Sequence, residues 1–129
     1  MMRASVTKIL SFDAAHSLPD HEGKCRNLHG HSYRVEVTVA GEIRRQGPAR
    51  GMVMDFSELE ERAERLIVEP LDHRFLNEVV DFPPTAERLA LWMMERLRAD
   101  GLPVVRIRLW ETPTSYAEVE ADPPDGVTV

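Results

Sequence analysis

The sequence predicts an α+β fold: a four-stranded antiparallel sheet that carries two helices on one face, in the order ββααββ. Two observations predict it. Residues 5–16, 28–43, 104–111 and 115–121 each alternate between apolar and polar side chains, as half-buried strands do. Residues 55–69 and 85–100 instead repeat apolar side chains at helical spacing, and they lie between the two pairs of strands. Such an order is typical of an antiparallel sheet covered on one side.

The first two predicted strands have histidine at one end of their apolar faces. Side chains two residues apart in a strand point to the same face. In the first strand, His16 follows apolar residues of its own parity: Leu10, Phe12 and Ala14. In the second, His29 and His31 precede Tyr33, Val35, Val37 and Val39. We therefore expect three imidazoles to meet where the buried faces of two neighbouring strands end.

Local signals bound the two helices. Asp55 has the capping-box spacing to Glu58 at the start of the first helix, and Pro70 stops that helix. Thr85 is a good N-cap for the second helix. Residues 71–84 are expected to form a connecting segment. A four-stranded sheet also leaves open edges, which oligomerisation through those edges would pair.

Glu111 ends the apolar row of the third predicted strand, in phase with Ile107 and Leu109. A carboxylate there can accept two parallel N–H bonds from an amidine-like group such as that of a pterin or guanine ring. A strand-end glutamate that reaches solvent is an equally good interpretation of the residues alone. Residues 122–129 are expected to be a peripheral, disordered tail.

The three histidines favour a metal site. Buried imidazoles need polar partners, and a metal ion is one such partner. Catalytic Zn²⁺ usually has three protein ligands and one open position. The matching strand phases of His16, His29 and His31 therefore favour zinc over three ordinary histidines in a half-buried sheet. Three neutral imidazoles would leave the zinc its full charge, which acidifies a bound water and polarises a carbonyl.

Two further candidates lie in predicted loops. Cys25 stands between Lys24 and Arg26, whose charges favour a reactive thiolate. From spacing alone, a fourth zinc ligand and a base or nucleophile beside the metal are equally good interpretations, and a buried inert thiol is a third. The adjacent Asp72 and His73 form a possible acid–base unit, although the residues alone favour an ordinary surface pair.

Composition excludes several classes of protein. The chain has 129 residues, enough for one domain over residues 1–129, and its net charge of −6 makes nucleic acid an unexpected partner. No apolar run approaches the ~18 residues of a membrane span, and a signal-peptide pattern is absent. The single cysteine excludes an internal disulfide. We therefore expect a cytoplasmic protein with no membrane partner.

Several motifs, taken in order, resemble the 6-pyruvoyltetrahydropterin synthase superfamily. They are FDAAH at 12–16, CRNLHGHSY at 25–33, GMVMDF at 51–56, LDH at 71–73, LN at 76–77, PTAE at 84–87 and ET at 111–112. The resemblance covers nearly the whole chain. The three residues between Cys25 and His29 look most like the bacterial branch, the 6-carboxytetrahydropterin synthases of queuosine biosynthesis. The pyruvoyl-forming enzymes typically have a longer gap.

The resemblance implies a tunnelling fold, in which oligomerisation joins the sheets into a barrel, commonly a homohexamer built as a dimer of trimers. It implies that His16, His29 and His31 bind zinc and that Cys25 is catalytic rather than a ligand. It also implies that Asp72 and His73 form a proton relay and that Glu111 anchors the pterin ring.

The activity that the resemblance implies is that of a zinc-dependent lyase acting on a small pterin triphosphate. It would convert 7,8-dihydroneopterin triphosphate to 6-carboxy-5,6,7,8-tetrahydropterin, acetaldehyde and triphosphate. Two alternatives stay open: a 6-pyruvoyltetrahydropterin synthase that uses the same residues, and a non-catalytic zinc- or pterin-binding module. A zinc hydrolase is a third, and it would not need Cys25.

Overall fold

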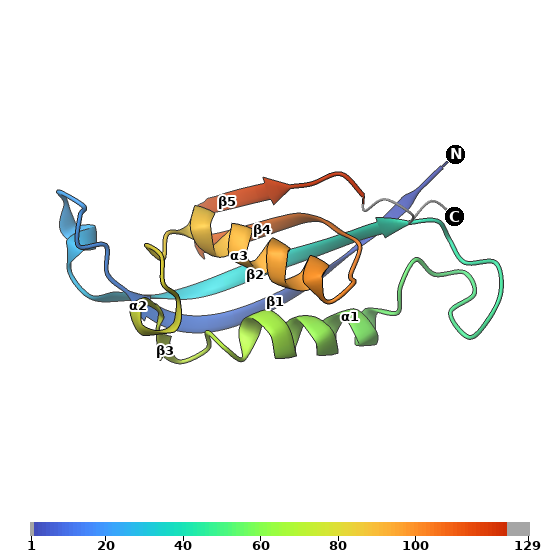
Figure 1. Cartoon of the computed structure of the whole chain (residues 1–129), viewed down its shortest axis with the longest axis horizontal. Helices are drawn as coiled ribbons and strands as arrows, with labels where there is room; N and C mark the ends of the chain where they lie inside the picture. Colours follow the sequence, from blue (N-terminus) through green and yellow to red (C-terminus); the bar gives the residue numbers. More distant parts are fainter. Residues whose placement is uncertain (1, 124–129) are drawn as a thin grey trace.

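In the computed structural model, which describes residues 2–123, a mixed sheet of five strands runs in the order β3-β1-β2-β4-β5 (Figure 1). Its strands are β1 (Ala4–His16), β2 (His29–Gly41), β3 (Arg74–Phe75), β4 (Val104–Thr112) and β5 (Ser115–Glu120). The pairs β1–β2, β2–β4 and β4–β5 are antiparallel, whereas β3 is parallel to β1. The α+β class and the four long strands are confirmed.

The predicted four-stranded sheet and its ββααββ order are wrong in the segment between the two long helices. That segment contains β3 and the short helix α2 (Leu76–Val79) in addition to its turns. The strand β3 has 2 residues, too few to show any alternation in the sequence. It forms because the outer edge of β1 presents free backbone donors and acceptors to a segment that lies along it.

The two long helices begin where the sequence predicts. In α1 (Phe56–Ala63), the Asp55 side chain accepts a hydrogen bond from the Ser57 N–H at 2.7 Å, and a π-helical turn, η2 (Glu64–Val68), continues the helix. In α3 (Ala86–Ala99), the Thr85 hydroxyl accepts from the Arg88 N–H at 3.2 Å. These side chains satisfy N–H groups that have no partner within the helix.

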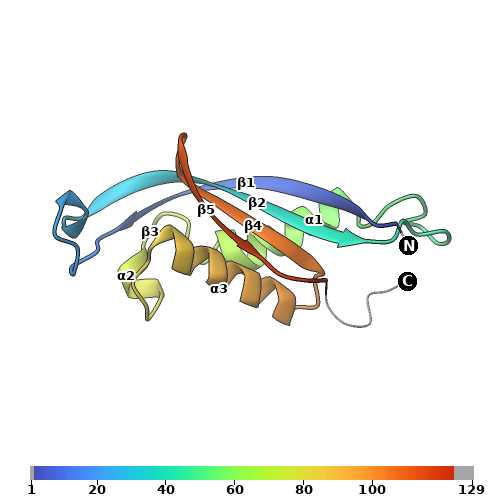
Figure 2. The same cartoon turned by 90° about the horizontal axis from the view of Figure 1, so that it is seen from above.

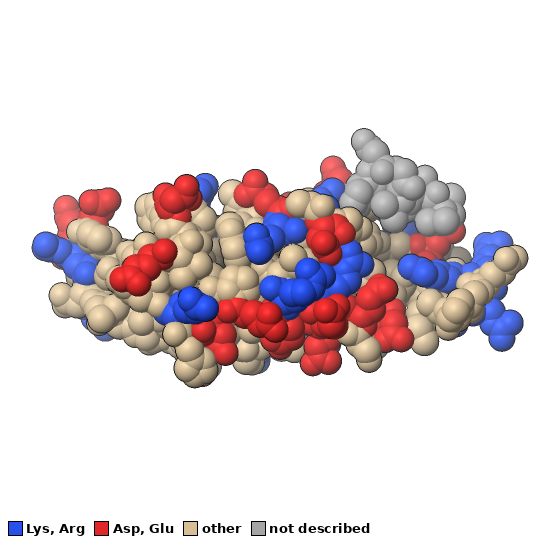
Figure 3. Space-filling model, turned by 60° about the horizontal axis from the view of Figure 1, so that its bottom comes forward, with Lys and Arg blue, Asp and Glu red and all other residues tan. Residues whose placement is uncertain are grey.

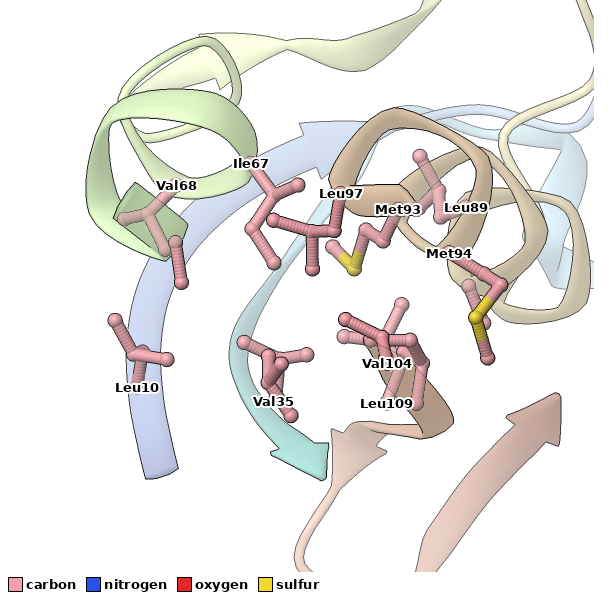
Figure 4. Packing of buried hydrophobic residues seen from close by; sticks show 14 of the residues in the cluster. Leu10, Val35, Ile67, Val68, Leu89, Met93, Met94, Leu97, Val104 and Leu109 are labelled. Carbon is pink, nitrogen blue, oxygen red and sulfur yellow. The ribbon is translucent and has the colours of Figure 1, made fainter. Parts of the chain in front are cut away.

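Both long helices pack on one face of the sheet, and one hydrophobic core lies between the layers (Figures 2 and 4). Its members come from alternate positions of β1, β2 and β4 and from the inner sides of the helices; they include Leu10, Val35, Ile67, Met93 and Leu109. The outer side of α1 is solvated instead. Figure 3 shows acidic side chains gathered along that side, with basic side chains next to them. Lys8 of β1 and Glu60 of α1 form an ion pair.

The strands β1 and β2 are the longest elements of the sheet and carry the predicted histidines to one end of the molecule. They pair without interruption from Ala4↔Gly41 to His16↔His29. The loop after His16 contains the short 3-10 turn η1 (Lys24–Arg26) and lies at that end (Figure 1). None of the helices within residues 2–123 has the length and apolar composition to cross a membrane. Most of the predicted tail, residues 124–129, lies outside the described residues.

Candidate active site

Three imidazoles meet at the end of the β1–β2 ladder. The register pairs His16 directly with His29, and Ala14 with His31, so that all three rings lie on the inner face of the sheet. One ring nitrogen of each histidine lies within 4.8 Å of one nitrogen of the other two. His16 is 1% exposed, whereas His29 and His31 are half-buried. The structure thus brings together the three residues whose strand parity predicted that they would meet.

Backbone carbonyls orient two of these rings. His16 Nδ1 lies 2.8 Å from the Pro84 carbonyl oxygen, and His29 Nδ1 lies 2.7 Å from the Asn27 carbonyl oxygen. A carbonyl only accepts, so each Nδ1 must carry the proton and donate it. Each Nε2 then has a free lone pair, and the two Nε2 atoms face each other at 3.0 Å. Two lone pairs at that distance need a cation between or beside them, and this donor set fits a metal ion.

The third imidazole shares its surroundings with a carboxylate. His31 Nε2 is buried, has no hydrogen-bond partner among residues 2–123 and lies 3.6 Å from Glu111 Oε1. Burial lowers the pKa of His31, and the neighbouring imidazoles act in the same direction, although Glu111 opposes them. The neutral form of His31, which is the form that binds metals, is therefore favoured. Glu111 itself lies at a register shift in the β4–β5 ladder and faces the imidazoles.

Tyr33 lies behind His31 and completes the buried wall. Its ring stacks on Phe12 at 4.8 Å between centroids and meets the His31 ring edge-on at 5.5 Å. Its hydroxyl is buried and has no hydrogen-bond partner in the described part of the chain, and burial together with the Glu111 charge raises the pKa of Tyr33 above its usual range. The hydroxyl therefore stays protonated and can act only as a neutral donor or acceptor toward this site.

Cys25 lies in η1, in the loop that joins the two histidine-bearing strands. The residue is half-buried, and its carbonyl accepts a hydrogen bond from the Leu18 N–H at 2.9 Å. Across residues 2–123, the metal-binding group at this end contains the three imidazoles and no sulfur. The structure thus keeps the thiol apart from the three ring nitrogens, and the catalytic role of Cys25 stays a prediction.

Asp72 and His73 form a hydrogen-bonded pair at the outer edge of β1. His73 Nδ1 lies 2.9 Å from Asp72 Oδ1, and the same oxygen accepts the Asp13 N–H at 3.0 Å. These bonds stabilise the carboxylate and lower the pKa of Asp72, and the Asp13 N–H makes the largest contribution. The pair gathers with Asp13 rather than with the three imidazoles. Within one chain, the predicted relay and the predicted metal ligands are therefore two separate groups.

His73 adopts an unusual backbone conformation. Its φ angle is +59°, in the left-handed region that side chains with a Cβ rarely adopt. Its N–H donates to the Asp13 carbonyl at 2.6 Å, which holds it there. Strain of this kind persists only where the surrounding structure enforces it, and it concentrates at functional sites.

Comparison with known proteins decides the family. The family model described as 6-pyruvoyl tetrahydropterin synthase matches residues 5–122. The chain belongs to the 6-pyruvoyl tetrahydropterin synthase family. A curated relative from Haemophilus influenzae, named 6-carboxy-5,6,7,8-tetrahydropterin synthase, is 37% identical over 89% of this chain and 97% of its own. A relative of the same name from Synechocystis is 44% identical over 87% and 89% of the two chains.

A solved structure supports the same assignment. The 6-pyruvoyl tetrahydropterin synthase of Caenorhabditis elegans superposes with a TM-score of 0.80 at 27% identity, covering 95% of this chain and 98% of its own. The family resemblance of the motifs is thereby confirmed, and with it the expectation that the chain is an enzyme of the 6-pyruvoyl tetrahydropterin synthase family.

Sequence reasoning missed the groups that hold the site in place. The Pro84 and Asn27 carbonyls orient imidazoles, and Asn77 bonds the backbone next to His16. A backbone carbonyl has no residue-type signal, so only the structure can reveal the first two. Asn77 did carry a signal, because it belongs to the LN motif at 76–77, although the motif alone does not show what the side chain binds.

Proposed function

We propose that this member of the 6-pyruvoyl tetrahydropterin synthase family is a zinc-dependent 6-carboxytetrahydropterin synthase. It would convert 7,8-dihydroneopterin triphosphate and one water to 6-carboxy-5,6,7,8-tetrahydropterin, acetaldehyde and triphosphate, in queuosine biosynthesis. The observation that carries the proposal is the cluster of three imidazoles, two with carbonyl-fixed tautomers, beside the carboxylate of Glu111. The names of two relatives at 37% and 44% identity support the choice of product.

His16, His29 and His31 would hold the zinc through their inward-facing ring nitrogens. When bound, zinc supplies a Lewis acid that polarises the oxygens of the substrate side chain. The carbonyls of Pro84 and Asn27 keep two of the rings in the ligand tautomer, so that no proton has to leave those nitrogens before the metal binds.

Glu111 would anchor the pterin ring. Its carboxylate faces His31 at 3.6 Å and is partly exposed, so it can accept paired N–H bonds from a ring that arrives beside the metal. Anchoring the ring fixes the distance between the side chain of the substrate and the imidazoles. Such positioning converts a collision between reactants into an event within one complex.

Cys25 would act as the general base, and His73, oriented by Asp72, as its partner in proton transfer. The 2.9 Å contact to Asp72 fixes one tautomer of His73 and leaves its other nitrogen free for a proton. His73 is 78% exposed in the isolated chain, so its working environment requires a second surface that excludes water.

Open sheet edges support assembly of copies into a barrel. On one side of the sheet β5 is an edge strand, and on the other side β3 pairs with only Ala14 and Ala15 of β1. Within the described residues, positions 4–12 of β1 therefore present an unpaired edge, which a second copy can pair. We expect a cytoplasmic homohexamer built as a dimer of trimers. Light scattering coupled to gel filtration would measure its mass.

The alternative within the family is a pyruvoyl-forming synthase with the same residues, an activity that the Caenorhabditis elegans protein carries in its name. Incubation of the zinc-loaded protein with 7,8-dihydroneopterin triphosphate, followed by mass spectrometry, tests both. Carboxytetrahydropterin with acetaldehyde supports the proposal. A pyruvoyl product would move the protein to the sister reaction. No turnover by a zinc-loaded protein would leave a zinc- or pterin-binding module as the better account.

A further inference from the structure

The end of β1 that carries His16 is held on its outer edge by one segment of the chain. Backbone groups of alternate strand residues point to the same edge, so Asp13, Ala15 and Ser17 face outward there. The Asp13 N–H donates to Asp72, and its carbonyl accepts the His73 N–H. Strand β3 then pairs with the next two residues of β1. Residues 72–75 thus run along this edge and take its hydrogen bonds in order.

Asn77 ends this series, because its side-chain amide makes the hydrogen bonds to Ser17 that a neighbouring strand would otherwise make. Its Oδ1 accepts the Ser17 N–H at 2.9 Å, and its Nδ2 donates to the Ser17 carbonyl at 2.8 Å. One amide therefore satisfies both backbone groups of one residue, the pattern that a neighbouring β-strand would supply. Ser17 is the residue directly after His16, beyond the last residue of β1.

Without Asn77, nothing among the hydrogen bonds of residues 2–123 would fix the backbone of Ser17 on this edge. The imidazole of His16 would keep its bond to the Pro84 carbonyl, but the backbone that carries the ring would be free to fray. A strand end held on one side only moves more easily than one held on both. The ring nitrogen that faces His29 at 3.0 Å would then lose its fixed place.

We propose that Asn77 is a positioning residue for the metal ligand His16, so that it sets metal affinity without contacting the metal. This inference rests on the proposed metal site. A purely structural role would lower stability only, whereas a positioning role lowers metal affinity at a stability that still keeps the protein folded. Groups that orient a ligand typically contribute about 10- to 100-fold in metal affinity.

Two variants of the full chain test the proposal. Asn77→Ala removes both bonds to Ser17, and the isosteric Asn77→Asp keeps an acceptor for the N–H but sets an oxygen against the carbonyl. Competition of each protein with a chromophoric chelator measures the dissociation constant for Zn²⁺. We expect both variants to bind Zn²⁺ about 10- to 100-fold more weakly than the wild type. The visible spectrum of bound Co²⁺ should change as well, because it reports ligand geometry.

Two control variants separate positioning from stability. Glu78→Ala changes the exposed neighbour of Asn77 on α2. Arg62→Ala removes the hydrogen bonds from α1 to Asp100 and should lower stability. Both controls should keep the Zn²⁺ affinity and the Co²⁺ spectrum of the wild type.

A measurement on the wild type covers the case in which neither Asn77 variant folds. Coupling is reciprocal, so Zn²⁺ must strengthen the bond that positions its ligand. Zn²⁺ should therefore slow hydrogen exchange at the Ser17 amide and leave that of the Arg50 amide unchanged, because Arg50 lies in an exposed turn far from the imidazoles and exchanges by local opening. Equal Zn²⁺ affinity in Asn77→Asp, or an unchanged Ser17 amide, overturns the inference while the metal site stands. A wild type that binds no Zn²⁺ removes the metal site and the inference with it.

Discussion

Removal of the metal should change the stability of the wild type far more than that of a variant lacking one imidazole. The perturbation is a chelator, applied to the wild type and to His29→Ala. In the metal-free wild type, the Nε2 atoms of His16 and His29 face each other at 3.0 Å with two lone pairs. The substitution relieves that contact but loses the bond to Asn27, worth about 1 kcal/mol. We therefore expect the two metal-free proteins to differ by no more than about 1 kcal/mol.

With zinc present, the wild type should become clearly more stable than His29→Ala. A ligand that binds only the folded state stabilises it by about 2.7 kcal/mol when its free concentration is one hundred times its dissociation constant. For a chain of 129 residues, 1 kcal/mol corresponds to roughly 3–5 °C in Tm. Zinc should therefore raise the Tm of the wild type by about 10 °C. His29→Ala, with two of the three imidazoles left, should show little of this increase.

Thermal unfolding followed by circular dichroism, with zinc and with chelator, measures all four states. The matched control is His21→Ala, because His21 is exposed in the loop, its ring accepts the Gly23 N–H, and it stands outside the imidazole group. His21→Ala should keep the full zinc-dependent increase. An equal increase in His29→Ala and His21→Ala would refute the assignment of the three imidazoles as metal ligands, whatever activity the protein shows.

Four further predictions address single residues. Cys25→Ala should abolish turnover yet retain stoichiometric zinc by elemental analysis; loss of the metal as well would make Cys25 a ligand. Glu111→Gln keeps the shape of the side chain but not its charge, so the KM for the pterin substrate should rise by about 10-fold, equivalent to ~1.4 kcal/mol for one charged hydrogen bond; an unchanged KM argues against ring anchoring. The lowered pKa of Asp72 means that its ionised form stabilises the folded state above the ordinary value of 3.8 and that this contribution is lost as pH falls through the lower, folded-state pKa. Urea unfolding should accordingly show the wild type more stable than Asp72→Asn at pH 6 and the difference shrinking below pH 4, whereas a constant difference would contradict the bonds to Asp13 and His73. Leu109→Ala truncates a side chain that is 0% exposed in the core, so urea unfolding should show a loss of about 2–5 kcal/mol with zinc binding retained.

The histidine cluster was predictable because strand parity is a strong physical constraint. Every second side chain of a strand lies on one face, so a buried Leu10 and Phe12 place His16 on the inner face too. The pairing of His16 with His29 follows from two long strands of equal length joined by one loop. The alternation of apolar and polar residues predicts the faces of the strands but says nothing about the loop between them. It therefore could not place Cys25, which lies in a short turn of that loop.

The connecting segment was the least predictable part of the fold, although it is important for the site. Its strand has 2 residues and its helix 4, which are too short for either periodicity to show. What fixes it is the set of backbone groups along the edge of β1, and those groups are identical in every residue. Only Asn77 offered a signal, since an amide can donate and accept at once, but the sequence could not say to which residue.

One edge of β1 therefore supports both groups of candidate catalytic residues. The backbone of Asp13 holds Asp72 and His73, and four residues later the backbone of Ser17 is held by Asn77 beside His16, the proposed metal ligand. A shift of the connecting segment along this edge would displace the proposed relay and loosen the proposed metal ligand together. Substitutions in the segment should consequently change proton transfer and metal affinity in parallel, even where they touch neither the metal nor the substrate.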